Sequence, residues 1–411
     1  MAWHFPAVTR LHASAALLWL TSLVGRAATL FFGFRVGRLG GIEALGVLAS
    51  ANLTVWILGA TTNLGLPDWA IFRAAKDKVR TGGPDAQLGA GHGLFLALTA
   101  PAFAVAFAAA PAIGGVSSLS GFARLLILAA ALQQLGWFGV ACLRGLGRPR
   151  AEALANLGSA VVLASGTLLA DGVAQLGLAL VCGNLCFLAA GAFATATLPS
   201  LRPALGSARN ALRQAGHSLE YLALGLGTYL VGTSDLLMAR LWLGPQEIGL
   251  LQSATLVARG ASAGPWLWAT LTLHRQEADR AAGRALTPGA RLGPVAIFTV
   301  AAIAAAWILL PWQARGYGLA LEALELPAKI AMGTAPLLYA TAALAPMAAV
   351  LRRRRTVVII GASLGLSVLA EATLLRPLGI GGVQVAAAMG QAMLVALLWR
   401  TRALEPAAPP G

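Results

Sequence analysis

Twelve apolar stretches, separated by short polar segments, recur along almost the whole chain. Each is about 20 residues long, which is the length an α-helix needs to cross the hydrocarbon core of a bilayer. They lie at 14–36, 45–67, 89–110, 122–143, 152–170, 174–197, 219–241, 249–271, 292–311, 329–350, 356–375 and 380–399. The pattern predicts an all-α polytopic membrane protein with about 12 transmembrane helices.

Composition supports the same class. The chain is 58% hydrophobic and only 11% charged, whereas soluble domains carry roughly 25% charged residues. The net charge of +15 comes from short basic clusters between the apolar stretches. Such spacing is typical of membrane orientation rather than of phosphate tracking, so we predict no nucleic-acid partner.

The basic residues also predict an orientation. If the N-terminus is cytoplasmic, the inner segments hold 21 Lys and Arg residues and the outer segments hold 7. Positive residues accumulate on the cytoplasmic side of membrane proteins, so both termini are expected inside. The first apolar stretch is longer than the core of a signal peptide and contains Arg26, which favours a retained first span.

Two similar turns indicate a duplicated architecture. Gly41 to Gly46 and Gly244 to Gly249 each form a G-x-x-x-x-G segment between two apolar stretches. The segments are 203 residues apart, close to half of the 411. We therefore predict two six-helix bundles, residues 1–205 with spans 1–6 and residues 206–411 with spans 7–12 and a short disordered tail.

Three charged residues interrupt the apolar stretches around these turns. Arg26 lies before the first turn and Arg259 after the second, each about 15–22 Å from its turn along a helix. Forked guanidinium donors suit phosphate or pyrophosphate, so one hypothesis is an anion-binding cavity between the halves. The alternative is a structural role for each arginine. Asp235 could pair with Arg259, or it could face the cavity and couple transport to protons or sodium.

Uncharged polar residues in the spans are weaker candidates for the cavity lining: Asn52, Gln133, Gln134 and Asn156. They could bind a sugar or form bonds between helices, as Asn184 could. Glu371 near the end of a span, followed by Arg376, is expected to reach a loop or the interface. No enzyme constellation, metal site or cofactor motif is present in the sequence, so we predict a protein that is not an enzyme and uses no cofactor.

The stretch LLWLTSLVGRAATLFFGFRVGRLGGIEALGVLASANLTVWILGATTNLGLPDWAIFRAAK, which starts at Leu17, resembles the start of the polysaccharide flippases of the multidrug/oligosaccharidyl-lipid/polysaccharide exporter superfamily. The matching features are an arginine in the first span, the glycine-flanked turn and a G-L-P segment before a basic loop. The segment from Leu226 to Arg259, with S-D-L-L-M-A-R before the second turn, is similar to spans 7 and 8 of that family. The first turn departs from the family pattern at Ile42 and Ala44.

The resemblance implies a V-shaped cavity between two six-helix bundles and a location in the bacterial inner membrane. It also implies that undecaprenyl-pyrophosphate-linked oligosaccharide moves from the inner to the outer leaflet by alternating access. In this interpretation Arg26 and Arg259 hold the pyrophosphate, the lipid tail stays among membrane lipids, and polysaccharide polymerase machinery is a partner.

Two other functions stay open at this point. A multidrug or organic-cation antiporter of the same superfamily would favour an acidic cavity. A polytopic polysaccharide polymerase or ligase would need a sizeable outer loop with catalytic groups, and no outer loop reaches 20 residues.

Overall fold

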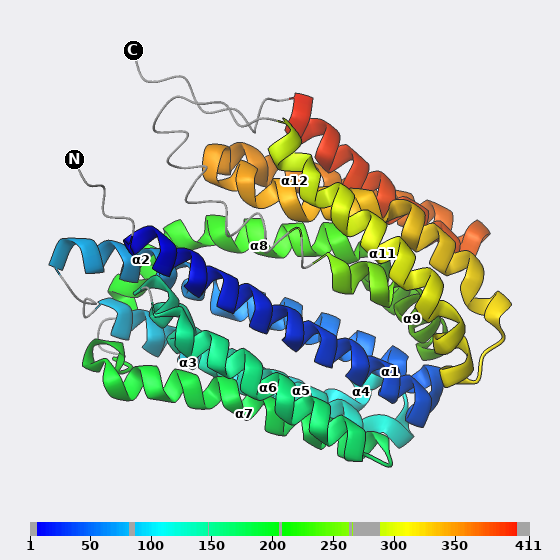
Figure 1. The fold of residues 1–411 in the computed structure, drawn as a ribbon, viewed down its shortest axis with the longest axis horizontal. Coiled ribbons are helices and arrows are strands. Elements are labelled where there is room, and N and C mark those ends of the chain that lie inside the picture. Colours follow the sequence, from blue (N-terminus) through cyan, green and yellow to red (C-terminus); the bar gives the residue numbers. More distant parts are fainter. Residues whose placement is uncertain are drawn as a thin grey trace. The chain divides into compact units, whose positions relative to one another are not determined.

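A computed structural model describes residues 6–81, 87–146, 148–204, 208–262, 265 and 288–400. These residues form α-helices and two short 3₁₀ helices, η1 (Ser117–Leu119) and η2 (Pro199–Leu201), and no strand among them. The α-helices are α1 (Pro6–Asn63), α2 (Leu66–Thr81), α3 (Gln87–Ala108), α4 (Ala110–Gly114), α5 (Ser120–Gly145), α6 (Pro149–Leu169), α7 (Val173–Thr197), α8 (Ala208–Trp242), α9 (Pro245–Ala261), α11 (Pro288–Tyr317) and α12 (Leu321–Arg400) (Figure 1).

The predicted all-α polytopic fold is confirmed. Within the described residues, nine helical segments are long and apolar enough to cross a membrane. Two of these segments each cover two of the spans predicted above: Leu20–Asn63 overlaps most of 14–36 and 45–67, and Arg354–Arg400 contains 356–375 and 380–399. The remaining predicted span, 249–271, begins in α9 and continues beyond the described residues. The segments that cover two spans, the segments that cover one span and α9 together account for the twelve apolar stretches of the sequence.

Long helices in this chain are interrupted where spans meet. Gly41 divides α1 with φ 72° and ψ −171°, a backbone conformation that only glycine adopts without strain. The first span therefore ends at the predicted turn, and a new helix starts immediately after it. A second interruption, at Thr233 with φ −134° and ψ 16°, divides α8 inside a predicted span rather than between two spans.

The chain divides into two compact units. Unit 1 comprises residues 1–39 and 54–222, and unit 2 comprises residues 40–53 and 223–411. The first part of the helix that follows Gly41 therefore belongs to unit 2, although the rest of that helix belongs to unit 1.

Unit 1 is built on α5, which packs against α2, α3 and α7, while α6 packs on α7. Its core includes Trp69, Phe95 and Phe138. Polar bonds connect the helices: Asn184 Nδ2 donates to Ala129 O at 3.0 Å, from α7 to α5. Buried polar groups in a membrane helix need such partners, so Asn184 holds two helices together, the commoner of the two roles considered for it.

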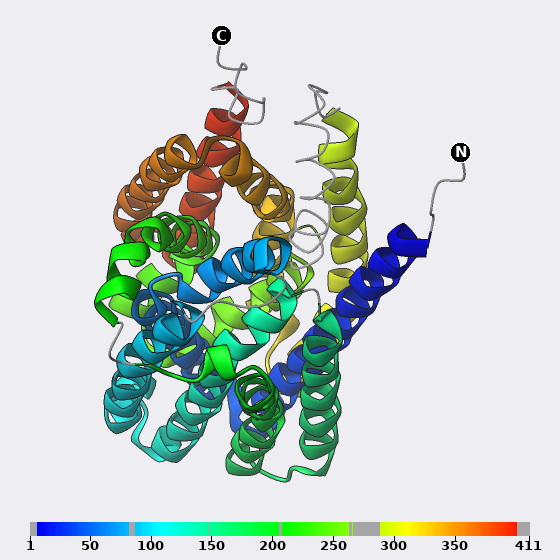
Figure 2. The same cartoon turned by 90° about the vertical axis from the view of Figure 1, so that its left-hand side faces the viewer.

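Unit 2 contains residues 40–53 of α1, the part of α8 from Ala223 onward, α9, α11 and α12. A straight helix of 80 residues would be about 120 Å long, yet residues from both ends of α12 share one core. Ala335 and Tyr339 are buried in the same cluster as Ile360 and Leu394, and Gln384 Nε2 donates to Pro327 O at 3.1 Å. The helix therefore folds back on itself, and Figure 2 shows its orange and red segments as separate rods.

Candidate functional site

Arg26 lies in α1, within unit 1 and within a segment long enough to span a membrane. Its side chain is exposed, and it has no hydrogen-bond or ion-pair partner among the residues that the structure describes. Its neighbours one helical turn away in sequence are Ser22, Leu23, Thr29 and Leu30, and none of them is charged. A guanidinium in such a span is costly without a partner.

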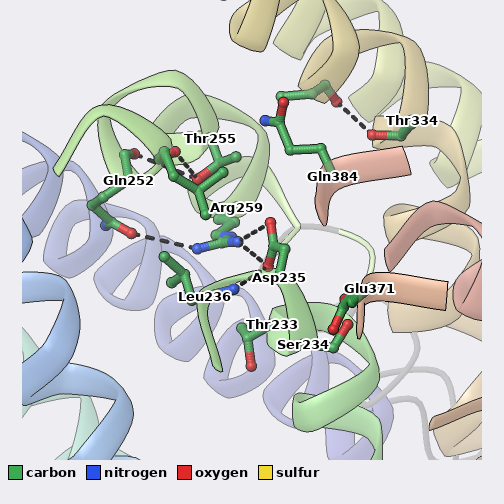
Figure 3. A network of polar contacts seen from close by, with 12 residues as sticks. Thr233, Ser234, Asp235, Leu236, Gln252, Thr255, Arg259, Thr334, Glu371 and Gln384 are labelled. Carbon is green, nitrogen blue, oxygen red and sulfur yellow. Dashed lines mark hydrogen bonds and ion pairs between the residues drawn. The ribbon is translucent and has the colours of Figure 1, made fainter. Parts of the chain in front are cut away.

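Arg259 has a partner within its own unit. Its Nη2 atom donates to both carboxylate oxygens of Asp235, at 2.5 and 2.7 Å, from α9 to α8 (Figure 3). Its Nη1 atom lies 3.4 Å from Gln252 Oε1. The side chains of Arg259 and Asp235 are 17% and 7% exposed, so the two charges neutralise each other in a largely buried place. The sequence left two alternatives for Asp235, an ion pair with Arg259 or a carboxylate that faces the cavity alone. The structure contains the ion pair.

The break in α8 at Thr233 lies two residues before Asp235 of this ion pair. Thr233 leaves the helical conformation about two turns before the end of the apolar stretch, and its hydroxyl donates to Tyr229 O at 2.9 Å. Gln391 Nε2 lies 3.5 Å from Val231 O, another carbonyl in the turn before the break. Asp235 Oδ1 accepts the N–H of Leu236 at 2.8 Å. Side chains thus satisfy backbone groups near the break, as a discontinuous membrane helix requires.

A small cavity adjoins the ion pair. Its polar lining comes from Thr255, Thr334, Gln384 and Gln391 in addition to Asp235 and Arg259. Its volume is about 30 Å³, which is room for one or two waters or a small ion. A sugar or a lipid head group does not fit into this space. Gln384 Oε1 is buried and has no hydrogen-bond partner among the described residues, so one acceptor is available there.

Glu371 was placed near an interface by the sequence, and that expectation is wrong. Its side chain is 0% exposed in α12. Its Oε1 atom accepts from Ser367 Oγ at 3.3 Å, and Ser367 Oγ lies 2.8 Å from Ser234 Oγ. Glu371 Oε2 is buried without a hydrogen-bond partner among the described residues.

A sequence signal for Glu371 was present. Ser363, Ser367 and Glu371 are four residues apart, and so they lie on one face of a helix that is otherwise apolar. All three are 0% exposed. A polar stripe of this kind inside a span favours an inward-facing row over a residue that reaches the membrane surface.

The weaker candidates are divided between the units. Gln133 and Gln134 on α5 and Asn156 on α6 are half-buried in unit 1, and Asn52 is exposed in the part of α1 that belongs to unit 2. None of the four has a hydrogen-bond partner among the described residues. Gln134 lies against Gly59 of α1, where a Cβ atom would be 3.1 Å from its amide group. Asn52, which shares unit 2 with the Asp235–Arg259 pair, is not among the residues that line the cavity at that pair.

The fold is shared with membrane transporters of known structure. An inward-closed structure of the lipid II flippase MurJ superposes with a TM-score of 0.67 at 11% identity, over 94% of this chain and 87% of that chain. An inward-facing multidrug resistance MATE family transporter of the MOP superfamily gives 0.64 at 17% identity, over 95% and 98%.

A third similar structure is a MOP superfamily transporter from Pyrococcus furiosus, described as having a binding pocket of reverse polarity. It gives a TM-score of 0.63 at 17% identity, over 95% of each chain. No family model and no curated protein matches the sequence. The chain therefore has the fold of these transporters at low sequence identity.

Proposed function

We propose that this protein is a transporter that flips undecaprenyl-pyrophosphate-linked oligosaccharide, such as a repeat unit of O-antigen or exopolysaccharide, from the inner to the outer leaflet. The observation that carries the proposal is Arg26, an exposed guanidinium inside a span of unit 1 with no hydrogen-bond or ion-pair partner among the described residues. A planar, permanently charged donor suits a pyrophosphate oxygen. The fold similarity to a lipid II flippase supports a lipid-linked substrate.

Arg259 has a different role in this proposal from Arg26. Its guanidinium already binds the Asp235 carboxylate, so a pyrophosphate would have to displace an internal anion to reach it. Arg26 is therefore the first cation that the substrate meets, and Arg259 becomes available only when its pair with Asp235 opens. The substrate would be bound by one arginine in the structure described and by two after that change.

We further propose that the protein lies in the bacterial inner membrane with both termini in the cytoplasm, and that it works by alternating access of a substrate site to either side. The bias of Lys and Arg between alternate segments supports this orientation. Membrane lipids would surround the tail of the substrate, and a polysaccharide polymerase would use the flipped product.

A multidrug or organic-cation antiporter is the second candidate. Two carboxyl groups, Asp235 and Glu371, are buried in unit 2, at 5% and 0% exposure. MATE family transporters share the fold. In this alternative a carboxyl group that gains and loses a proton, or binds sodium, would drive export, and Arg26 would have no substrate to bind.

The test is reconstitution into liposomes with a short undecaprenyl-pyrophosphate-linked saccharide, followed by measurement of its exposure on the opposite leaflet. The Arg26→Ala variant is compared with Arg124→Ala, which removes another exposed arginine from unit 1. We expect flipping by the unmodified protein and by Arg124→Ala, and a loss of about 10–100-fold in Arg26→Ala, the effect of one charged hydrogen bond.

Equal flipping rates in the two arginine variants would remove Arg26 from the mechanism. No flipping by the unmodified protein, together with ion-driven release of a cationic dye from the same liposomes, would establish the antiporter instead.

A further inference from the structure

Gln134 of α5 has a buried amide oxygen that accepts no hydrogen bond from the described residues. The Oε1 atom is shielded from solvent, and the whole side chain lacks a hydrogen-bond partner in that part of the chain. A buried amide group without a partner costs free energy, and such groups in folded proteins need an explanation. The proposed pyrophosphate site leaves Gln134 without a role.

A second amide in the same unit has the ordinary structural role. Asn184 of α7 donates to Ala129 O at 3.0 Å and thereby joins α7 to α5. Gln134 lies only about 7.5 Å further along α5 than Ala129, and it bonds no neighbouring helix among the described residues. Polar side chains in membrane helices commonly bond across helices, so Gln134 departs from the common use of an amide there.

Gly59 of α1 lies against the amide group of Gln134. A Cβ atom added to Gly59 would be 3.1 Å from both Cδ and Nε2 of Gln134. Both residues belong to unit 1. The glycine therefore lets the amide approach the backbone of α1, and the contact fixes the position of Gln134 relative to that helix.

Gln134 lies at nearly the same depth as Arg26. Arg26 precedes the break at Gly41 by 15 residues, and Gly59 follows it by 18 residues. Two consecutive spans cross a membrane in opposite directions, so Arg26 is about 22 Å and Gly59 about 27 Å from the turn. Because Gln134 contacts Gly59, its amide lies within about 5 Å of the level of Arg26.

Asn156 is a similar amide at another depth. Arg144 Nε of α5 donates to Glu152 Oε2 of α6 at 2.7 Å, and this bond fixes the register of the two antiparallel helices. Gln134 is ten residues from Arg144, and Asn156 is four residues from Glu152 in the same direction. Asn156 is therefore about 9 Å from the level of Gln134. It is also half-buried and also lacks a partner among the described residues.

We propose that Gln134 recognises the sugar that is attached to the pyrophosphate at Arg26, with its Oε1 atom accepting a hydrogen bond from a hydroxyl or acetamido N–H group. This role rests on the proposed function. In a sugar pyrophosphate the ring is bonded directly to a phosphate, so its substituents lie beside the anion, within reach of a residue at the level of Arg26. An uncharged amide suits a neutral sugar, whereas a guanidinium suits the phosphate.

The test compares two lipids that differ only in the sugar. Undecaprenyl pyrophosphate and undecaprenyl-pyrophosphate-linked N-acetylhexosamine are each titrated into the purified protein in detergent, and the Kd is measured for both. We expect the unmodified protein to bind the sugar-bearing lipid about 3–10-fold more tightly, the effect of one hydrogen bond. Gln134→Met keeps the length of the side chain without its amide. It should remove the preference and leave the Kd of the sugar-free lipid unchanged.

Two control variants locate the effect. Asn156→Leu removes the same chemical group about 9 Å away and should keep the preference for the sugar-bearing lipid. Arg26→Ala should weaken the binding of both lipids by the same factor, because the pyrophosphate is common to them.

The unfolding temperature in detergent separates recognition from a structural role. Gln134→Met removes a buried oxygen without a partner among the described residues, so its unfolding temperature should equal or exceed that of the unmodified protein. A lower unfolding temperature with the sugar preference retained would mean that Gln134 holds helices together, and this would overturn the proposal.

The binding data also distinguish this proposal from the proposed function. Equal affinity of the unmodified protein for the two lipids would overturn the sugar subsite and leave the pyrophosphate site in place. A preference that persists in Gln134→Met would place the sugar elsewhere. If the unmodified protein binds neither lipid, the proposed function fails and the subsite fails with it.

Discussion

Two arginines within apolar stretches are in opposite situations in the two units. Arg26 in unit 1 is exposed and has no partner among the described residues, whereas Arg259 in unit 2 donates to both oxygens of Asp235. A charged side chain in a membrane helix needs either a protein counter-charge or a functional one. The difference between them indicates that position in an apolar stretch does not by itself identify a ligand-binding arginine. The residues that pair with the guanidinium must also be known.

The largest effect on stability is expected for the Asp235–Arg259 pair of unit 2. Asp235→Ala leaves Arg259, 17% exposed, without its counter-charge, and removal of one partner of a buried pair costs about 3–5 kcal/mol. Thermal unfolding in detergent should therefore occur at a much lower temperature. The double variant Asp235→Ala/Arg259→Ala should recover much of the loss.

The Glu325–Lys329 pair provides the control for that experiment. Its atoms are 2.6 Å apart, but its side chains are 40% and 51% exposed. Glu325→Ala should cost less than about 1 kcal/mol, since solvent screens an exposed pair. Equal losses in Asp235→Ala and Glu325→Ala would show that burial does not distinguish the two pairs.

The second prediction distinguishes Arg26 from Arg259, because their alanine variants should lose different properties, transport in one case and stability in the other. Arg26→Ala should keep the unfolding temperature of the unmodified protein, since it removes no hydrogen bond or ion pair with a described residue, and should lose flipping by about 10–100-fold. Arg259→Ala should lower the unfolding temperature, because Asp235 is then buried alone. A stable Arg259→Ala protein together with an unstable Arg26→Ala protein would reverse the roles assigned here.

A smaller effect concerns Glu371. Glu371→Gln keeps the size of the side chain and an oxygen that accepts from Ser367, so the free energy of unfolding should change by less than about 1 kcal/mol. Glu371→Arg serves as the opposite control, because a permanent charge at a fully buried position should prevent folding. If the antiporter candidate is correct, Glu371→Gln should also abolish the dependence of dye release on the driving ion, with the fold intact.

The smallest effects are expected for the uncharged polar residues. Asn156→Ala removes a half-buried side chain with no partner among the described residues, so its unfolding free energy should change by less than about 0.5 kcal/mol. Asn184→Ala removes the bond to Ala129 O and should cost about 1–2 kcal/mol. A reduced flipping rate in Asn156→Ala without loss of stability would assign that residue to the sugar. Equal stability losses in the two variants would show that Asn156 has a structural role.

Part of the site could be predicted from the sequence because of simple geometry. Asp235 and Arg259 lie on opposite sides of a short turn at similar distances along antiparallel helices, so contact between them was one of two predicted outcomes. Burial of Glu371 was missed, since its position near the end of an apolar stretch resembled that of an interface residue. The row formed with Ser363 and Ser367 was visible in the sequence, but whether that face points inward depends on packing against α8.

The sequence by itself determined that this is an all-α membrane protein with a duplicated pattern of spans. Length, hydropathy and charge act along a single helix, and they set which segments cross a membrane whatever the neighbouring segments are. Only the tertiary structure decided which polar groups are satisfied, because a partner such as Ser234 for Ser367, or Glu43 for Gln246, comes from a segment 133 or 203 residues away. Contacts at that separation depend on how close two helices approach, and that distance is set by packing of small residues that the hydropathy pattern does not record.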